Sequence, residues 1–195
     1  GESLLEVKLH ALPENIKKLI LIIGYKGEMI REAIGTTYEG MDVTYVEQDI
    51  ETAYGTGAAL ALCKEHVTGE SVLVLMGDDI YAKEDLAKLC TYENAVLLDH
   101  KGEEKMLASW QVGVDGDRVT AFYQNVPEEH LRTGIINTAA YVLSPSYFDI
   151  EPEIGGDGEV QIPPTIIKMI EKGIVVNAVK ATYWKQVTAP EDLVI

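Results

Sequence analysis

Four short aliphatic runs in the first half of the chain constrain its fold more than any other feature. They are Leu19–Ile23, Val43–Val46, Ser71–Met76 and Ala95–Leu98. Runs of this length that are rich in β-branched residues are typical of strands buried on both faces. Helix-forming segments precede and separate them. This alternation predicts an α/β fold, in which helices cover both faces of a Rossmann-like, mostly parallel mixed sheet and give three layers.

Capping signals indicate where two of the helices begin. Ser3 and Glu6 match the S-x-x-E capping box, so we expect a helix that runs from there towards Pro13. Pro163-Pro164 is expected to open a second helix, which Gly173 closes.

The second half of the chain has a different pattern. Trp110–Val114 alternates in polarity, Asp115-Gly116-Asp117 is typical of a hairpin turn, and Val119–Tyr123 follows it. Ile135–Leu143 and Ile174–Val179 are further expected strands. We predict an antiparallel addition to the same sheet. The 195 residues are expected to form one domain, residues 1–195, because two domains would each have only half this length.

Charge and cysteine content exclude several classes of partner. The formal net charge is -16, whereas nucleic acid and anionic membranes require a basic face, so we expect neither as a partner. No apolar run reaches the roughly 18–20 residues of a membrane span. The chain opens Gly1-Glu2-Ser3 without a signal-peptide pattern, and its two cysteines suggest buried thiols in a reducing compartment. We therefore expect a cytoplasmic protein.

Polar residues follow the apolar strands at the edge where open α/β sheets bind ligands. Gly77-Asp78-Asp79 could hold Mg²⁺, which usually takes one or two carboxylates together with substrate phosphates; the alternative is a turn that caps the next helix. Gln48 and the turn Gly55-Thr56-Gly57 could recognise a planar ligand such as a nucleobase; the alternative is a flexible helix entry.

Several of these segments together resemble one enzyme family. The collinear pieces are Tyr45-Val46-Glu47-Gln48, Gly55-Thr56-Gly57-Ala58-Ala59-Leu60, Val72 to Asp79, Asn137-Thr138-Ala139-Ala140-Tyr141-Val142-Leu143, and Tyr183-Trp184 followed by Ala189-Pro190-Glu191-Asp192-Leu193. Their order and spacing are similar to those of the sugar-phosphate nucleotidyltransferases, such as the glucose-1-phosphate thymidylyltransferases and uridylyltransferases. The resemblance covers almost the whole chain and implies the nucleotidyltransferase fold.

The resemblance also implies a reaction. Members of the family join a nucleoside triphosphate to a sugar 1-phosphate, giving a nucleotide sugar and pyrophosphate. By this resemblance Gln48 and the Gly55–Gly57 turn recognise the base, Asp78 holds Mg²⁺ against the α-phosphate, and Asn137 and Glu159 lie near the sugar. Positioning and charge neutralisation account for most of such catalysis.

One departure from the family is a missing segment. The family begins with a central strand and a G-x-G-T-R phosphate loop, and this chain begins after them. Without that strand, two neighbouring strands should be left unpaired. We therefore expect that the chain is a piece of a longer protein, or that something else fills the gap.

Other departures concern the sugar-phosphate side. The family's second metal aspartate falls at Gln186, which we keep as a candidate metal ligand, and Lys185 beside it is a candidate replacement cation in catalysis. An E-K pair falls at Gln124-Asn125, and a glycine near the sugar falls close to Trp110; Gln124 and Trp110 are therefore candidate substrate contacts.

Three functions remain open on these residues. The first is a Mg²⁺-dependent sugar-phosphate nucleotidyltransferase, whose partners are a nucleoside triphosphate and a sugar 1-phosphate. The second, suggested by Gln186 and Gln124, is a non-catalytic regulatory subunit on the same fold that binds a nucleotide sugar. The third is a glycosyltransferase, ranked last because Asp78-Asp79 is not the D-x-D motif of that class. The base, the sugar and any homo-oligomer stay open.

Overall fold

The structure, a computed structural model, describes residues 2–100, 110–124, 134–155, 158–189 and 192. The first helix, α1 (Leu4–His10), begins as its capping box predicts. The side chain of Glu6 accepts hydrogen bonds from the amide of Ser3 at 2.7 Å and from its hydroxyl at 2.8 Å. The amide of Glu6 donates to the Ser3 hydroxyl in return, so both partners satisfy backbone groups at the helix start.

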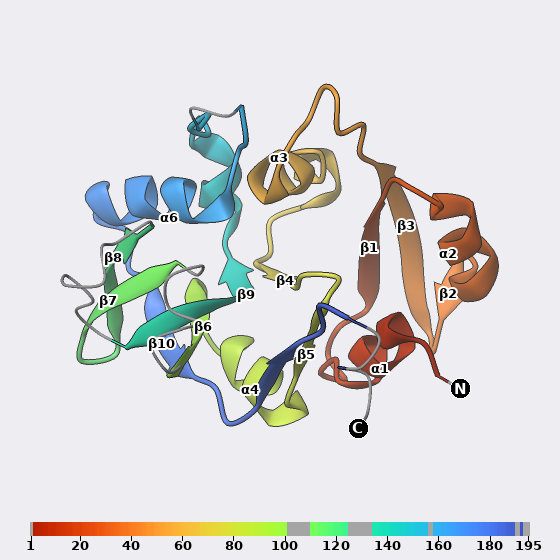
Figure 1. Ribbon diagram of the computed structural model, residues 1–195, viewed down its shortest axis with the longest axis horizontal. Coiled ribbons are helices and arrows are strands. Elements are labelled where there is room, and N and C mark those ends of the chain that lie inside the picture. Colours follow the sequence, from red (N-terminus) through yellow and green to blue (C-terminus); the bar gives the residue numbers. More distant parts are fainter. Residues whose placement is uncertain (1, 101–109, 125–133, 156–157, 190–191, 193–195) are drawn as a thin grey trace.

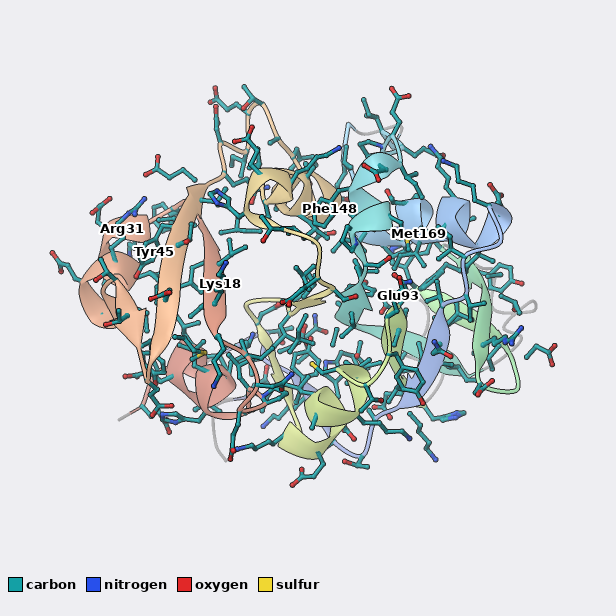
Figure 2. All side chains as sticks on the ribbon, turned by 180° about the vertical axis from the view of Figure 1, so that it is seen from behind. Lys18, Arg31, Tyr45, Glu93, Phe148 and Met169 are labelled. Carbon is teal, nitrogen blue, oxygen red and sulfur yellow. The ribbon has the colours of Figure 1, made fainter. Side chains whose placement is uncertain are left out.

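The first strands form a sheet of their own. Strand β1 (Lys18–Ile23) pairs in parallel with β3 (Met41–Glu47), and β2 (Thr37–Tyr38) pairs antiparallel with β3. Helix α2 (Gly27–Ile34) connects β1 to β2. Its Arg31 guanidinium carbon lies 4.6 Å from the ring centroid of Tyr45 in β3, so α2 covers one face of this sheet (Figure 2).

A second, six-stranded sheet lies beside the first (Figure 1). Its strands are β4 (Val72–Val74), β6 (Ala95–His100), β7 (Gln111–Asp115), β8 (Arg118–Tyr123), β9 (Ile135–Leu143) and β10 (Asn177–Lys180). They are ordered β4-β9-β6-β10-β8-β7. Strand β9, the longest, therefore lies in the interior of the sheet between β4 and β6.

Helices cover both faces of the six-stranded sheet. In β6, Ala95 and Leu97 pack into a core with Leu86 of α4 (Lys83–Leu89), whereas Val96 and Leu98 face a second core with Met169. Met169 belongs to α6 (Ile162–Glu171), which lies on the same side as the 3₁₀ helix η3 (Pro145–Asp149) and α3 (Thr56–Ala61), as Figures 1 and 2 show. A short 3₁₀ helix, η1 (Lys64–His66), follows α3. This confirms the three-layer α/β architecture.

A third, two-stranded ribbon is formed by β5 (Asp79–Tyr81) and β11 (Trp184–Gln186), which pair antiparallel. Neither strand was expected from the sequence, because three residues are too few to show a period of two. The ribbon thereby pairs the segment that follows β4 with a segment near the C-terminal end of the described residues.

The expectation of one mostly parallel sheet is wrong. Among the described residues only β1–β3 and β6–β10 pair in parallel, and the other pairs are antiparallel. Strand β9 lies between β4 and β6 and is antiparallel to both. Apolar runs report burial and not the identity of the partner strand, so the sequence could not exclude this insertion.

The expectation of unpaired strand edges agrees with the topology. Within the described residues β1 pairs only with β3, and β4 pairs only with β9. In Figure 1 these are the edge strands at which the two sheets approach each other. The runs Leu19–Ile22 and Val72–Met76 are wholly aliphatic but only half-buried, so the expected burial of these strands on both faces is not reached.

A few expectations lie outside the described residues, namely those at Asn125, Pro190, Glu191 and Leu193. In the part of the chain that the structure describes, no helix is long and apolar enough to cross a bilayer. The same part contains no cluster of three or more His, Cys, Asp or Glu side chains arranged to hold a metal.

Candidate active site

Gln48 lies directly after β3 and fixes the loop that follows it. Its backbone amide donates to the carbonyl of Ile23 at 2.8 Å, which ties the ends of β3 and β1 together. Its side-chain nitrogen donates to the carbonyl of Ala53 at 2.7 Å and lies 3.4 Å from that of Gly55. The side chain therefore holds the conformation of the turn Tyr54–Gly57, here called the glycine turn.

The glycine turn docks on the segment that contains Glu159. The amide of Gly57 donates to the carbonyl of Val160 at 2.8 Å, and the amide of Val160 donates to the carbonyl of Tyr54 at 2.9 Å. Gly55 has φ +105°, and a Cβ there would lie 2.4 Å from the Val160 oxygen. Only glycine fits this conformation and this close approach of two backbones. Thr56, between the two glycines, is exposed.

The structure brings together the four residues predicted near the sugar. The indole nitrogen of Trp110 donates to the side-chain oxygen of Gln161 at 2.5 Å, and the Gln161 nitrogen donates to Glu159 at 2.7 Å. The amide of Asn137 donates to the carbonyl of Trp110 at 2.9 Å. Gln124 is exposed and directly follows Tyr123, the ladder partner of Gln111, so it lies at the same strand ends as Trp110.

Asn137 stabilises an irregular point in β9. Its side-chain oxygen accepts from the amide of Ala139 at 3.0 Å, and its side-chain nitrogen donates to the hydroxyl of Tyr141 at 2.6 Å. Burial raises the pKa of Tyr141, so the hydroxyl stays protonated. Ala139 has φ +59°, a conformation that favours glycine, and the register of β9 against β6 shifts at this point.

Gly77, Asp78 and Asp79, here called the acidic turn, lie where the chain passes from β4 into β5, which Asp79 begins. Asp78 is exposed, whereas Asp79 is 2% exposed and its carboxylate accepts from the indole nitrogen of Trp184 at 2.8 Å. Burial raises the pKa of Asp79 to about 6, although the hydrogen bond from Trp184 lowers it. The two neighbouring carboxylates therefore differ in role: Asp79 is structural, and Asp78 faces solvent.

Strand β11 brings Gln186 next to the acidic turn. Gln186 is the ladder partner of Asp79, and the amide of Val187 donates to the carbonyl of Asp78 at 2.7 Å. Lys185 pairs instead with Ile80. Because side chains alternate along a strand, Lys185 lies on the opposite face of the ribbon from Gln186.

A buried aspartate on α4 anchors the start of β11. Asp85, 2% exposed, accepts from the amides of Thr182 at 2.7 Å and Tyr183 at 3.2 Å. It also accepts from the Thr182 hydroxyl at 3.1 Å. A carboxylate that accepts several hydrogen bonds fixes the backbone direction into Trp184 and Gln186.

The sequence did not single out the groups that hold the site together. Gln161 joins Trp110 to Glu159 but precedes an ordinary helix, and nothing in its neighbourhood marks it. Asp85 lies in an exposed-looking acidic helix start. The sequence marks Trp184 only as part of a motif, whereas in the structure its indole nitrogen donates to the carboxylate of Asp79.

Comparisons with known proteins agree with this architecture. A family model described as "Nucleotidyl transferase" matches residues 1–194. The bifunctional protein GlmU of Methanococcus maripaludis is 26% identical over 99% of this chain. The chain spans about half of that relative, 46% of its length. The UTP–glucose-1-phosphate uridylyltransferase AglF of Haloferax volcanii is 26% identical over 90% of this chain and 74% of its own length.

A solved structure supports the fold independently of close sequence similarity. The crystal structure of apo UDP-glucose pyrophosphorylase superimposes with a TM-score of 0.80. The match covers 96% of this chain and 81% of that one at 15% identity. At this level of identity the likeness establishes the fold alone.

Proposed function

Because this chain belongs to the nucleotidyl transferase family, we propose that it transfers a nucleotidyl group from a nucleoside triphosphate to a sugar 1-phosphate and releases pyrophosphate. The observation that carries this proposal is the docking of the glycine turn on the Glu159–Gln161 segment through the Gly57–Val160 hydrogen bond. Residues proposed for the base and residues proposed for the sugar thus belong to one continuous structural unit.

In this proposal Gln48 and the glycine turn form the base side. The Gln48 side chain keeps the turn in place through Ala53, and the glycines allow a nucleobase to approach the backbone closely. Thr56 is exposed and offers a hydroxyl to the nucleotide. Trp110, Gln124, Asn137 and Glu159 form the sugar side around Gln161.

Asp78 and Gln186 are the residues that would hold Mg²⁺. The donor set fits a metal that arrives with its nucleotide, because an exposed carboxylate and an amide oxygen on the neighbouring strand leave most coordination positions to phosphate and water. A bound Mg²⁺ would neutralise charge on the phosphates during transfer. The chain's own contribution is to keep Asp78 at the end of β4, through the Val187 bond to its carbonyl. Lys185 lies on the face of the ribbon opposite Gln186 and stays a candidate catalytic cation.

We also propose that activity requires a further strand between β1 and β4. Among the described residues each of these strands has one unpaired edge, and their aliphatic side chains are only half-buried, as expected of interior strands that lack a neighbour. Such a strand could also bring a phosphate-binding loop to the acidic turn. Comparing pyrophosphate release by residues 1–195 with that by the protein isolated from its natural source tests this requirement. Equal rates would exclude it.

The experiment for the reaction is a panel assay. The protein from its natural source is incubated with Mg²⁺ and pairs of nucleoside triphosphates and sugar 1-phosphates, and pyrophosphate is measured. We expect release with one preferred pair. If no pair gave pyrophosphate, the proposed enzymatic activity would be refuted and the regulatory alternative would be favoured.

Gln186 is the specific observation that favours the regulatory alternative, since an amide is a weaker Mg²⁺ ligand than a carboxylate. A regulatory subunit should bind a nucleotide sugar in calorimetry without turnover. If Gln186→Asp raises turnover strongly, the site is a weakened enzyme instead.

The cellular setting is part of the proposal. Both cysteines in the described residues are free thiols, Cys63 buried and Cys90 half-buried, which supports a reducing cytoplasm. The net charge of -16 supports small phosphorylated substrates over nucleic acid or membranes as partners. A homo-oligomer stays a prediction for sedimentation analysis.

A further inference from the structure

Lys8 is a buried lysine in a position that the proposed function does not use. It lies in α1 and is 6% exposed, beside the core residue Leu9. Its ammonium nitrogen donates to the backbone carbonyl of Met76, the residue directly before the acidic turn. Removing an ammonium group from water is costly, so a lysine is rarely buried unless partners offset the cost.

The partners of Lys8 all belong to the acidic turn or adjoin it. Besides the carbonyl of Met76, the carboxylates of Asp79 and Asp78 attract the ammonium and partly offset the effect of burial, which lowers the pKa of Lys8. Helix α1 packs on β5, the strand that Asp79 begins. The carboxylate of Asp79 also accepts a hydrogen bond from the indole nitrogen of Trp184 at 2.8 Å. Lys8 and Trp184 therefore approach the turn from two different elements.

Burial alone does not require a charge at this position. A methionine would fill similar space without desolvation, and replacing buried charges by apolar residues is often neutral or stabilising. What methionine would not supply is a donor to the Met76 carbonyl or a positive charge that interacts with the two adjacent carboxylates.

We infer that Lys8 is a positioning residue that fixes the acidic turn, so that the Asp78 carboxylate is presented to a divalent metal. This inference deepens the proposed function and rests on it for the role of the metal. Through the Met76 carbonyl, Lys8 anchors the backbone where it leaves β4. The Val187 amide, which donates to the Asp78 carbonyl at 2.7 Å, anchors the same turn from β11.

The Val187 amide provides a reporter inside the chain. Hydrogen exchange at this amide is measured by NMR as a ratio to the exchange of the β6 amides, so that a change in global stability cancels. We expect Lys8→Met to raise this ratio about tenfold or more, which is the scale of losing a hydrogen bond to a charged donor. Lys8→Gln, which keeps a neutral donor, should give an intermediate ratio.

Lys64 offers a matched control. Its ammonium also donates to a backbone carbonyl, that of Phe148 at 2.8 Å, but its side chain is 58% exposed and lies on η1. Lys64→Met should leave the Val187 ratio unchanged. A Val187 ratio in Lys8→Met within twofold of the unsubstituted protein would overturn the inference, whatever the melting temperatures.

Binding of Mn²⁺ in the presence of a nucleoside triphosphate, followed by electron paramagnetic resonance, tests the second half of the inference, because the metal is proposed to arrive with its nucleotide. We expect Lys8→Met to weaken Mn²⁺ binding about tenfold and Lys64→Met to leave it unchanged. Equal binding by Lys8→Met and the unsubstituted protein would overturn the role in metal presentation. If the unsubstituted protein bound no Mn²⁺ and released no pyrophosphate, the proposed function would fall together with that role, whereas the exchange ratio would still decide whether Lys8 fixes the turn.

Discussion

The amide of Gly57 donates to the carbonyl of Val160 across 2.8 Å, although more than a hundred residues separate the two in sequence. The bond joins the start of α3 to the segment that precedes α6, and the Val160–Tyr54 bond at 2.9 Å runs in the opposite direction beside it. Because both bonds are between backbone groups, the geometry depends on glycines at the contact and not on particular side chains.

Gly55→Ala should destabilise the protein more than Gly40→Ala. Both glycines have positive φ, +105° and +82°, so alanine is strained at either position by about 1 kcal/mol. Only at Gly55 would the new Cβ overlap a backbone atom, the Val160 oxygen at 2.4 Å, which adds a further ~1–3 kcal/mol. Urea unfolding of the two variants measures the difference. Equal loss of stability would mean that the glycine turn is not held against Val160.

Trp110→Phe and Trp184→Phe should affect different kinetic parameters. Each removes one indole donor: the first bonds Gln161 at 2.5 Å, the second bonds Asp79 at 2.8 Å. We expect Trp110→Phe to raise KM for the sugar 1-phosphate, and Trp184→Phe to raise the Mg²⁺ concentration needed for half-maximal rate. Each of these two values should rise about fivefold to tenfold, because one hydrogen bond contributes about 1 kcal/mol. Identical kinetic changes in both variants would contradict the division of the site.

Ala139→Gly should stabilise the protein. Ala139 is held at φ +59°, where glycine is not strained, so the substitution should raise the free energy of unfolding by about 0.5–1 kcal/mol. Ala140→Gly is the matched control, because Ala140 is buried in the same strand without positive φ and the substitution there should be destabilising. Thermal unfolding of both variants checks the opposite signs.

The capping box at α1 should make stability depend on acid through Glu6. The hydrogen bonds from the Ser3 amide and hydroxyl lower the pKa of Glu6 in the folded state. A carboxylate with a lowered pKa stabilises the fold above its unfolded pKa, and this stabilisation is lost as the pH falls through the folded pKa. Glu6→Gln should therefore be less stable than the unsubstituted protein at neutral pH, and the difference should shrink in acid. A difference that grows in acid would contradict the capping role.

The sequence predicted the elements better than their pairing. The Ser3–Glu6 capping box and the apolar run in β6 follow from local rules, capping geometry and burial, and both appear in the structure. The insertion of β9 between β4 and β6 depends on contacts between distant segments, for which a single sequence carries no periodic signal. The edges of β1 and β4 that stay unpaired within the described part of the chain could be foreseen only because the resemblance indicated a missing strand.

In the candidate site, too, some residues could be predicted from the sequence and others depend on contacts between distant segments. Trp110, Asn137 and Glu159 were predicted from the family resemblance, and the structure brings them together. Gln161 and Lys8 were missed for different reasons. Gln161 acts only through the side chains that it joins, and a lysine in an amphipathic helix is normally expected on the solvent face. Their contacts are visible only once distant elements have packed.

The most direct test of the central claim is the Mg²⁺-dependent rate of pyrophosphate release by the protein from its natural source and by its Asp78→Asn variant. Asp149→Asn, at another exposed aspartate, is the control. Asp78→Asn should lower the rate at least about a hundredfold, which corresponds to roughly 3 kcal/mol of transition-state stabilisation, and Asp149→Asn should not change it. An Asp78→Asn variant as active as the unsubstituted protein would show that the acidic turn does not hold the metal.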